Sequence, residues 1–188
     1  DSMLNAEQIE ASRRAIYPSL SPEQRASLPV SPLSMSERAL DLVFSLNPKL
    51  TDDGVVFRST YDGDQHLFTP ESAVADQELL GADLQTVLDV CAALPSDRRV
   101  LSDAVERTAQ WAARARTAHR RTDDQALFGI VQGGDLPDLR VESARRTVEH
   151  DFDGYAIGGL SVGETRDVML PALAAALGEL PADQPRYL

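Results

Sequence analysis

Three predicted strands of this chain end in residues that suit a binding site. These residues are Asp89 with Cys91, Gln132 with Gly133 and Gly134, and Gly158 with Gly159. In parallel α/β proteins, ligands collect where strands end, because the loops there are free of packing roles and helix amino termini point N–H groups the same way. Three such endings in series therefore indicate one site. Each also has a structural interpretation, since an Asp after a strand is often a cap or turn former and Gly-Gly is common turn geometry.

No metal or cofactor motif accompanies these residues. Cys91 is the only cysteine, and the three histidines form no metal-ligand pattern with it. The glycine spacing matches neither a phosphate-binding loop nor the Gly-x-Gly-x-x-Gly fingerprint. We therefore expect no bound metal and no nucleotide cofactor in this chain.

Two groups of arginines could touch phosphates. They are Arg107, Arg114 and Arg121, which recur every seven residues, and Arg140, Arg145 and Arg146. For both groups we favour a solvated outer helix face, with Trp111, Ala112 and Ala115 of the first helix turned inward.

The elements that must position these residues alternate along the chain. An Asp-Gly turn at 62–63 between two β-rich runs predicts a hairpin. Thr69 is predicted to cap a helix that ends at Gly81. Strands at 84–88, 126–131 and 154–157 then alternate with helices at 102–121, 137–150 and 166–180, and 185–188 begins another strand. Repeated βα units predict a parallel sheet, either a closed barrel or a doubly wound open sheet.

Composition bounds the class of protein. The chain has 188 residues, of which 43% are hydrophobic and 26% charged, as in an ordinary folded domain. Its net charge of −12 argues against non-specific nucleic-acid binding, so any RNA contact must be local. One cysteine excludes an internal disulfide, and no apolar run approaches the roughly 20 residues of a membrane span. We expect a cytoplasmic protein with no membrane partner.

Longer motifs resemble one family. The matching segments include Gly-Val-Val-Phe-Arg-Ser at 54–59, Leu-Asp-Val-Cys at 88–91, Leu-Phe-Gly-Ile-Val-Gln-Gly-Gly at 127–134 and Phe-Asp-Gly-Tyr-Ala-Ile-Gly-Gly-Leu-Ser-Val-Gly-Glu at 152–164. In order and spacing they resemble tRNA-guanine transglycosylase, also called queuine tRNA-ribosyltransferase. The resemblance implies an α/β fold, part of a (β/α)8 TIM barrel over 43–188, after an atypical amino-terminal segment at 1–42. It also implies replacement of the wobble guanine of tRNA by a 7-deazaguanine, in the queuosine pathway.

The resemblance assigns substrate-binding roles to five residues. Asp89 resembles the carboxylate that accepts both N1–H and the 2-amino group of guanine, while Gln132 and the Gly159 N–H stand where the family donates to O6. Leu160 resembles the residue whose backbone carbonyl receives the amine of the 7-substituent. Cys91 lies beside the purine in the family and is no nucleophile there. The target base must leave its stack to be read in this way.

The chain also departs from the family pattern. Before the Val-Phe-Ser-Leu segment at 43–46, the glycines and aromatic residue of the family are missing. Glu37 and Asp1 are rival candidates for the family's acid/base Asp. The nucleophilic Asp and the Cys and His ligands of the structural zinc belong to family segments beyond Leu188. We expect the central part of a transglycosylase, inactive alone, from an enzyme that is a homodimer at full length. The alternative is a non-catalytic partner or guanine-binding subunit.

Overall fold

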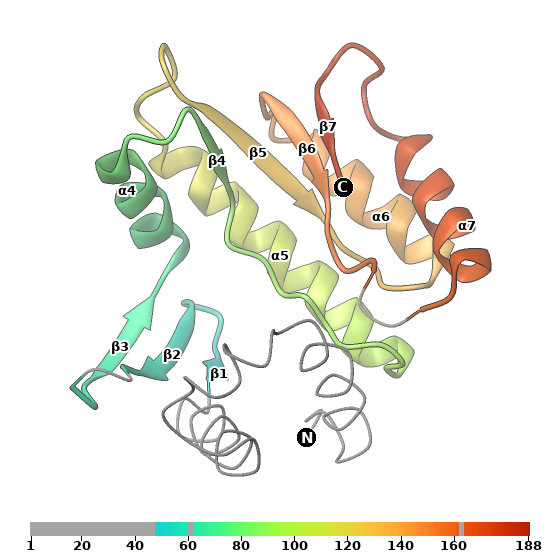
Figure 1. Ribbon diagram of the computed structural model, residues 1–188, viewed down its shortest axis with the longest axis horizontal. Helices are drawn as coiled ribbons and strands as arrows, with labels where there is room; N and C mark the ends of the chain where they lie inside the picture. Colours follow the sequence, from blue (N-terminus) through green and yellow to red (C-terminus); the bar gives the residue numbers. More distant parts are fainter. Residues whose placement is uncertain (1–47, 60–61, 162–163) are drawn as a thin grey trace, which may run out of the picture. The chain divides into compact units, whose positions relative to one another are not determined.

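The computed structural model describes residues 48–59, 62–161 and 164–188 (Figure 1). The described residues fall into two units, one formed by Pro48 with the described residues of Phe57–Gln65 and the other by Lys49–Val56 with His66–Leu188. The second unit contains all the strand-end residues named above. The predicted domain boundary at 42/43 and the acid/base candidates Glu37 and Asp1 lie outside the described residues.

Three short strands open the described part: β1 (Lys49–Leu50), β2 (Val55–Arg58) and β3 (Gln65–Phe68). The predicted hairpin turn lies between β2 and β3. The Ser59 N–H donates to the Asp64 carbonyl at 2.8 Å, and the Gly63 N–H donates to the Ser59 carbonyl at 3.0 Å. Gly63 has φ +80°, a left-handed conformation that glycine adopts without strain. The Asp-Gly signal is therefore confirmed.

Helix α4 (Pro70–Leu80) begins and ends as its sequence predicts. The Ser72 N–H donates to Thr69 Oγ1 at 3.2 Å, and the Thr69 N–H donates back to Ser72 Oγ at 2.9 Å. This reciprocal capping box satisfies backbone donors that the first helical turn leaves unpaired. At the other end Gly81 adopts φ +72° and stops the helix.

The rest of the chain alternates strand and helix. The strands are β4 (Leu84–Thr86), β5 (Ala126–Val131), β6 (Gly154–Ile157) and β7 (Arg186–Tyr187), and the helices between them are α5 (Arg98–Ala118), α6 (Pro137–Val148) and α7 (Arg166–Leu177). The four strands form one parallel sheet in chain order. None of the described helices is both long and apolar enough to cross a membrane.

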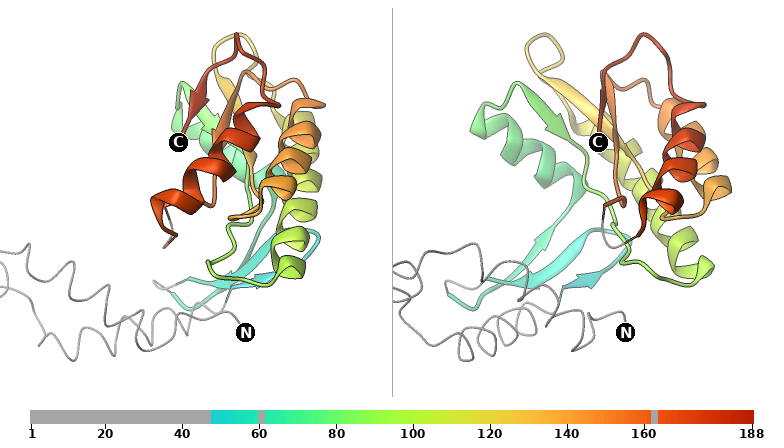
Figure 2. Two further views of the ribbon diagram at one scale, coloured as in Figure 1. Left: turned by 90° about the vertical axis from the view of Figure 1, so that its right-hand side faces the viewer. Right: turned by 45° about the vertical axis from the view of Figure 1, so that its right-hand side comes forward.

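The strand order decides where the helices lie. Crossovers between parallel strands are almost always right-handed, so strands added in one direction place their connecting helices on one face. Accordingly, α5 and α6 lie on the same side of the sheet (Figure 2). A doubly wound sheet would reverse its strand order and have helices on both faces. The α/β class with a parallel sheet is thus confirmed, and the described order is not doubly wound.

Several element boundaries differ from their predicted positions. Helices α5, α6 and α7 end at Ala118, Val148 and Leu177, two or three residues early, and the end of β4 and the start of α5 differ as well. β4 ends at Thr86, before the predicted end at 88, although the Val87 N–H still donates to the Phe128 carbonyl at 3.1 Å. Further along, the Val90 N–H donates to Thr108 Oγ1 of α5 at 3.0 Å. α5 begins at Arg98, four residues early, and the Leu101 N–H already donates to the Asp97 carbonyl. The paired arginines of this first turn hide the helix start from a hydrophobic-periodicity analysis.

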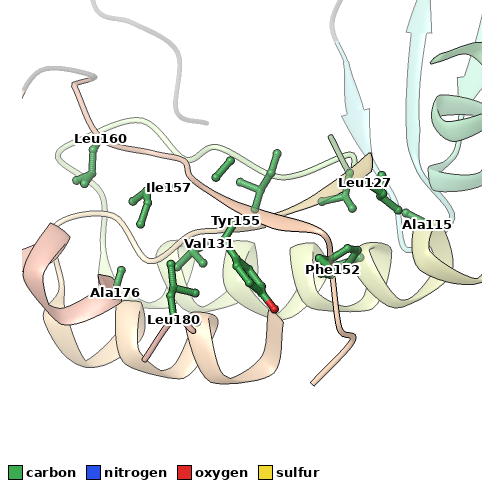
Figure 3. Close-up of a cluster of buried hydrophobic side chains, with 14 of the residues drawn as sticks. Ala115, Leu127, Val131, Phe152, Tyr155, Ile157, Leu160, Ala176 and Leu180 are labelled. Carbon is green, nitrogen blue, oxygen red and sulfur yellow. The ribbon is translucent and has the colours of Figure 1, made fainter. Parts of the chain in front are cut away.

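The core fills the space between the sheet and its helices. Leu127 and Val131 of β5 are fully buried, and Tyr155 and Ile157 of β6 lie beside them (Figure 3). Residues from the helices and loops complete the cluster, among them Ala115, Ala144, Phe152, Ala172, Ala176 and Leu180. The Asp153 carboxylate ties the loop before β6 to β5 by accepting from the Leu127 N–H at 2.9 Å.

In the first arginine group, Arg107 and Arg114 are half-buried on α5 and Arg121 is exposed just after the end of this helix. Trp111, Ala112 and Ala115 have no exposed surface and face inward. Arg114 donates two hydrogen bonds of 2.7 Å to Glu71, and this pairing lowers the pKa of Glu71 to about 2. These arginines are engaged in ion pairs within the protein, which disfavours a phosphate-binding role.

Gly129 on β5 provides a test of this packing. A Cβ at this position would lie 2.5 Å from both the Phe152 ring and the Thr147 methyl group. We expect Gly129→Ala to lower the free energy of unfolding by about 1–3 kcal/mol, the usual effect of overpacking. Denaturant titration followed by circular dichroism measures this change.

Gly178 is the matched control for that substitution. It has a right-handed φ of −65°, and an added Cβ would meet only ordinary contacts of 3.6 Å or more. Gly178→Ala should leave stability unchanged or raise it by up to about 1 kcal/mol. Equal stability of both variants would contradict the close packing at Gly129.

Candidate functional site

The structure brings two of the predicted site residues into direct contact. Asp89 follows β4 and Gln132 follows β5, its parallel neighbour. Gln132 Nε2 donates a hydrogen bond of 2.5 Å to Asp89 Oδ2. Gln132 is itself buried, and its backbone N–H donates to Ser143 Oγ on α6 at 2.9 Å. The two side chains therefore lie at one edge of the sheet, as the strand-end prediction requires.

Gly158 and Gly159 leave the space that the Gln132 amide occupies. A Cβ on Gly158 would lie 2.5 Å from Gln132 Nε2, and a Cβ on Gly159 would lie 2.4 Å from Gln132 Oε1. Gly159 also has φ +62°, a conformation that disfavours any residue with a side chain. Both glycines therefore border the same site as Asp89 and Gln132, and a side chain at either position would displace the Gln132 amide.

Cys91 lies at the same site. Partial burial and the negative charge of Asp89 raise the pKa of its thiol, while the Gly159 backbone N–H and the charge of Arg140 lower it. Since the net direction is upward, the protonated thiol predominates at neutral pH. Cys91 is thus placed beside the base-recognition candidates and shows no activation as a nucleophile.

Leu160 is placed differently from the other candidates. Its side chain is 8% exposed and packs in the hydrophobic core. The predicted role rests on its backbone carbonyl and not on this side chain. That role therefore stays a prediction.

Burial dominates the electrostatics of Asp89. Removal of the carboxylate from water raises its pKa above the ordinary value of 3.8, and the hydrogen bond from Gln132 opposes the rise without cancelling it. A half-buried carboxylate with one side-chain donor retains capacity to accept further hydrogen bonds. Together, Asp89 and Gln132 can present acceptors and a donor to one planar polar ligand.

Arg140 was wrongly placed by the sequence interpretation. We predicted a solvated outer face, whereas the structure gives Arg140 no exposed surface. Helical periodicity offered a signal, because Arg140 shares the spacing of Ser143, Ala144 and Thr147, all of which are buried on α6. Its guanidinium donates to the carbonyls of Gly158 and Gly159 and so contacts the backbone of the site. Small neighbours on that helix face make room for the large cation.

The zinc site of the family does not fit these residues. Within 48–59, 62–161 and 164–188, no group of three His, Cys, Asp or Glu side chains could hold a metal ion. Cys91 is the only thiol of the chain, and a structural zinc site draws on several Cys and His ligands. No step of the chemistry is therefore assigned to a metal.

The raised pKa of Asp89 predicts how stability depends on pH. A carboxyl with a higher pKa in the folded chain contributes stability that is complete below the unfolded value of 3.8 and is lost as the pH rises through the folded value. Ionisation of Asp89 thus lowers stability as the pH rises, and the neutral variant Asp89→Asn should be more stable than the parent at pH 7. The difference should shrink as the pH falls toward about 4, as denaturant titrations across this range would show.

Asp138 gives a control of opposite sign. It is exposed, and its ion pair with Arg98 lowers its pKa, so Asp138→Asn should lose a little stability at pH 7. Should Asp89→Asn also be less stable than the parent at pH 7, Asp89 would be a structural cap of its loop, contrary to the buried-charge interpretation.

Comparisons with known proteins agree with the resemblance seen in the motifs. A family model described as "Queuine tRNA-ribosyltransferase" matches residues 34–188. The queuine tRNA-ribosyltransferase of Thermoanaerobacter pseudethanolicus is 51% identical over 148 residues, and those of Pelotomaculum thermopropionicum and Desulforudis audaxviator are each 53% identical over the same length. Each match covers 78% of this chain but 40% of the relative, so the chain spans less than half the length of these relatives. With most of its residues matched by the family model, the chain belongs to the queuine tRNA-ribosyltransferase family.

Proposed function

We propose that this chain carries the base-recognition part of a tRNA-guanine transglycosylase, which replaces the wobble guanine of tRNA with a 7-deazaguanine. The observation that carries the proposal is the contact between Asp89 and Gln132 at neighbouring strand ends, beside the Gly159 backbone. Family membership supports the reaction class, a pentosyl transfer in the queuosine pathway.

The hydrogen-bonding groups of the site match the edge of guanine. Guanine offers two adjacent donors, N1–H and the 2-amino group, and one acceptor, O6. A carboxylate accepts from both donors at once, which Asp89 can do, and an amide N–H donates to O6, which Gln132 can do. In the free chain these two side chains satisfy each other. When guanine binds, bonds from Asp89 and Gln132 to the guanine edge replace the bond between these two side chains. The Gly159 N–H is then a second donor to O6.

We propose a partial (β/α)8 barrel as the scaffold. Sequential parallel strands with α5 and α6 on one face support this architecture, and barrel enzymes bind ligands at the carboxyl ends of their strands. A retaining displacement at C1′ needs a carboxylate that attacks the sugar. Asp89 already pairs with Gln132, so we assign it to recognition, and Glu37 remains a weak candidate for acid/base chemistry.

The partners follow from the same proposal. They are tRNA, guanine or a 7-deazaguanine, and a second protomer in a homodimer, with the reaction in the cytoplasm. The net charge of −12 disfavours broad contact with RNA, so recognition must come from local contacts around a base that has left its stack. The proposed roles of Cys91 and Leu160 are contacts beside the purine and to its 7-substituent.

Calorimetric titration of the full chain with guanine tests base recognition. We expect guanine to bind and Asp89→Asn to weaken it by about 10- to 100-fold, because one hydrogen bond to a charged group contributes about 1.5–3 kcal/mol. Adenine, which lacks both the N1–H and the 2-amino group, should bind neither form.

Asp138→Asn serves as the control for loss of one carboxylate, since Asp138 is exposed and paired with Arg98 away from Gln132. Its affinity for guanine should equal that of the parent. Guanine binding that survives in Asp89→Asn would remove Asp89 from the site, and absence of guanine binding by the parent would refute the recognition proposal.

A non-catalytic guanine-binding subunit is the second candidate. The hydrogen bond between Asp89 and Gln132 favours this candidate, because it holds the Asp89 carboxylate in a position suited to base recognition. Incorporation of labelled guanine into unmodified tRNA tests this candidate. Turnover near 1 per second or above by this chain would refute a non-catalytic subunit, whereas guanine binding without incorporation is the result expected of both candidates.

A further inference from the structure

Arg140 is a buried cation whose hydrogen bonds end on backbone carbonyls. Nε donates to the Gly134 oxygen at 2.7 Å, and Nη1 donates to the Val131 oxygen at 3.1 Å. Burial lowers the pKa of Arg140 to about 10, and the negative charges of Glu164 and Asp135 oppose this shift. The guanidinium therefore stays charged at neutral pH. Burial of such a charge is unfavourable unless its N–H groups are paired, so these carbonyls must keep their orientation.

The same guanidinium holds two successive peptide groups after β6. Nη1 donates to the Gly158 oxygen at 2.5 Å, and Nη2 donates to the Gly159 oxygen at 2.8 Å. A trans peptide group is planar, and its carbonyl and N–H point in opposite directions. The first bond therefore turns the Gly159 N–H away from Arg140, and the second turns the Leu160 N–H away.

The electrostatics of Cys91 agree with this orientation of the Gly159 N–H. Hydrogen bonding from the Gly159 backbone lowers the pKa of the Cys91 thiol, which also senses the charge of Asp89. The N–H thus faces the part of the site that contains Asp89 and Cys91. Gly159 adopts a left-handed φ of +62° and has no side chain to hold it there. Its orientation therefore depends on the carbonyl bonds to Arg140.

We propose that Arg140 is a positioning residue for base recognition, which aims the Gly159 N–H at the acceptor oxygen of an oxopurine by holding the carbonyls of Gly158 and Gly159. This inference rests on the function proposed above. A purine without that oxygen gives the N–H no partner. Arg140 therefore contributes to the preference for an oxopurine over a purine that lacks the oxygen.

The first test compares guanine with 2-aminopurine, which keeps the 2-amino group but has neither the oxygen at C6 nor the hydrogen on N1. Arg140→Lys keeps the positive charge but loses the planar fork that spans several carbonyls. We expect the affinity for guanine to fall about tenfold, the effect of one weakened hydrogen bond, and the affinity for 2-aminopurine to stay unchanged. Equal losses for both bases would overturn the positioning role.

The second test needs no ligand. Cys91 is the only cysteine, so the pH dependence of alkylation by iodoacetamide reports the pKa of this thiol alone. We expect Arg140→Lys to raise the pKa of Cys91, because the Gly159 N–H is no longer held toward it while the nearby positive charge remains. Arg145→Lys is the matched control, since Arg145 is exposed and pairs with Glu179; it should change neither readout.

The two tests separate failure of this inference from failure of the proposed function. An unchanged Cys91 pKa in a folded Arg140→Lys chain would overturn the positioning role, whether or not a base binds. A shifted Cys91 pKa in a chain whose parent binds no guanine would refute the proposed function and support the orientation of Gly159 by Arg140. Loss of the folded state in both Arg140→Lys and Arg140→Gln would assign Arg140 to stability and overturn the inference.

Discussion

Parallel pairing in chain order is the constraint on which this structure depends. Each of the strands β4 to β7 pairs with the next in the sequence, so their carboxyl ends meet at one edge of the sheet. Asp89 and Gln132, 43 residues apart, come into contact there without any local loop between them. The same order places the connecting helices α5 and α6 on one face, from which α6 supplies Ser143 and Arg140 to the residues at the strand ends.

The sequence predicted the elements better than it predicted the side-chain contacts. The bounds of β5 and β6 and the cap of α4 agree with the structure, because buried β-rich runs and a Thr-Pro start are local signals. The meeting of Asp89 and Gln132 followed from strand order alone. The burial of Arg140 was missed, since the residue looks like part of a basic surface group until the backbone carbonyls around it are known. Hydrogen bonds between segments distant in sequence carry no local pattern.

The site combines a firmly held side chain, Gln132, with a carboxylate, Asp89, whose ionised form is unfavourable in the folded chain. Gln132 is held by Ser143 through its backbone and enclosed by two glycines, so its amide has little freedom. Asp89 is half-buried and pays desolvation whenever it is ionised, which its single side-chain donor does not offset. A carboxylate kept in such surroundings is explained by ligand recognition better than by folding, because a neutral amide would suit the free chain. Stability and recognition thus oppose each other at this position.

The glycines around Gln132 also limit how this site can vary. Any side chain at 158 or 159 would collide with the amide, and the left-handed turn at Gly159 excludes most residues independently. Substitution at the β6 edge of the site therefore also displaces the Gln132 amide. Cys91, on the loop after β4, is exposed and has no such steric limit. New ligand preferences, natural or engineered, must therefore be introduced from the β4 side, where a changed side chain alters the ligand contacts and leaves the supporting backbone intact.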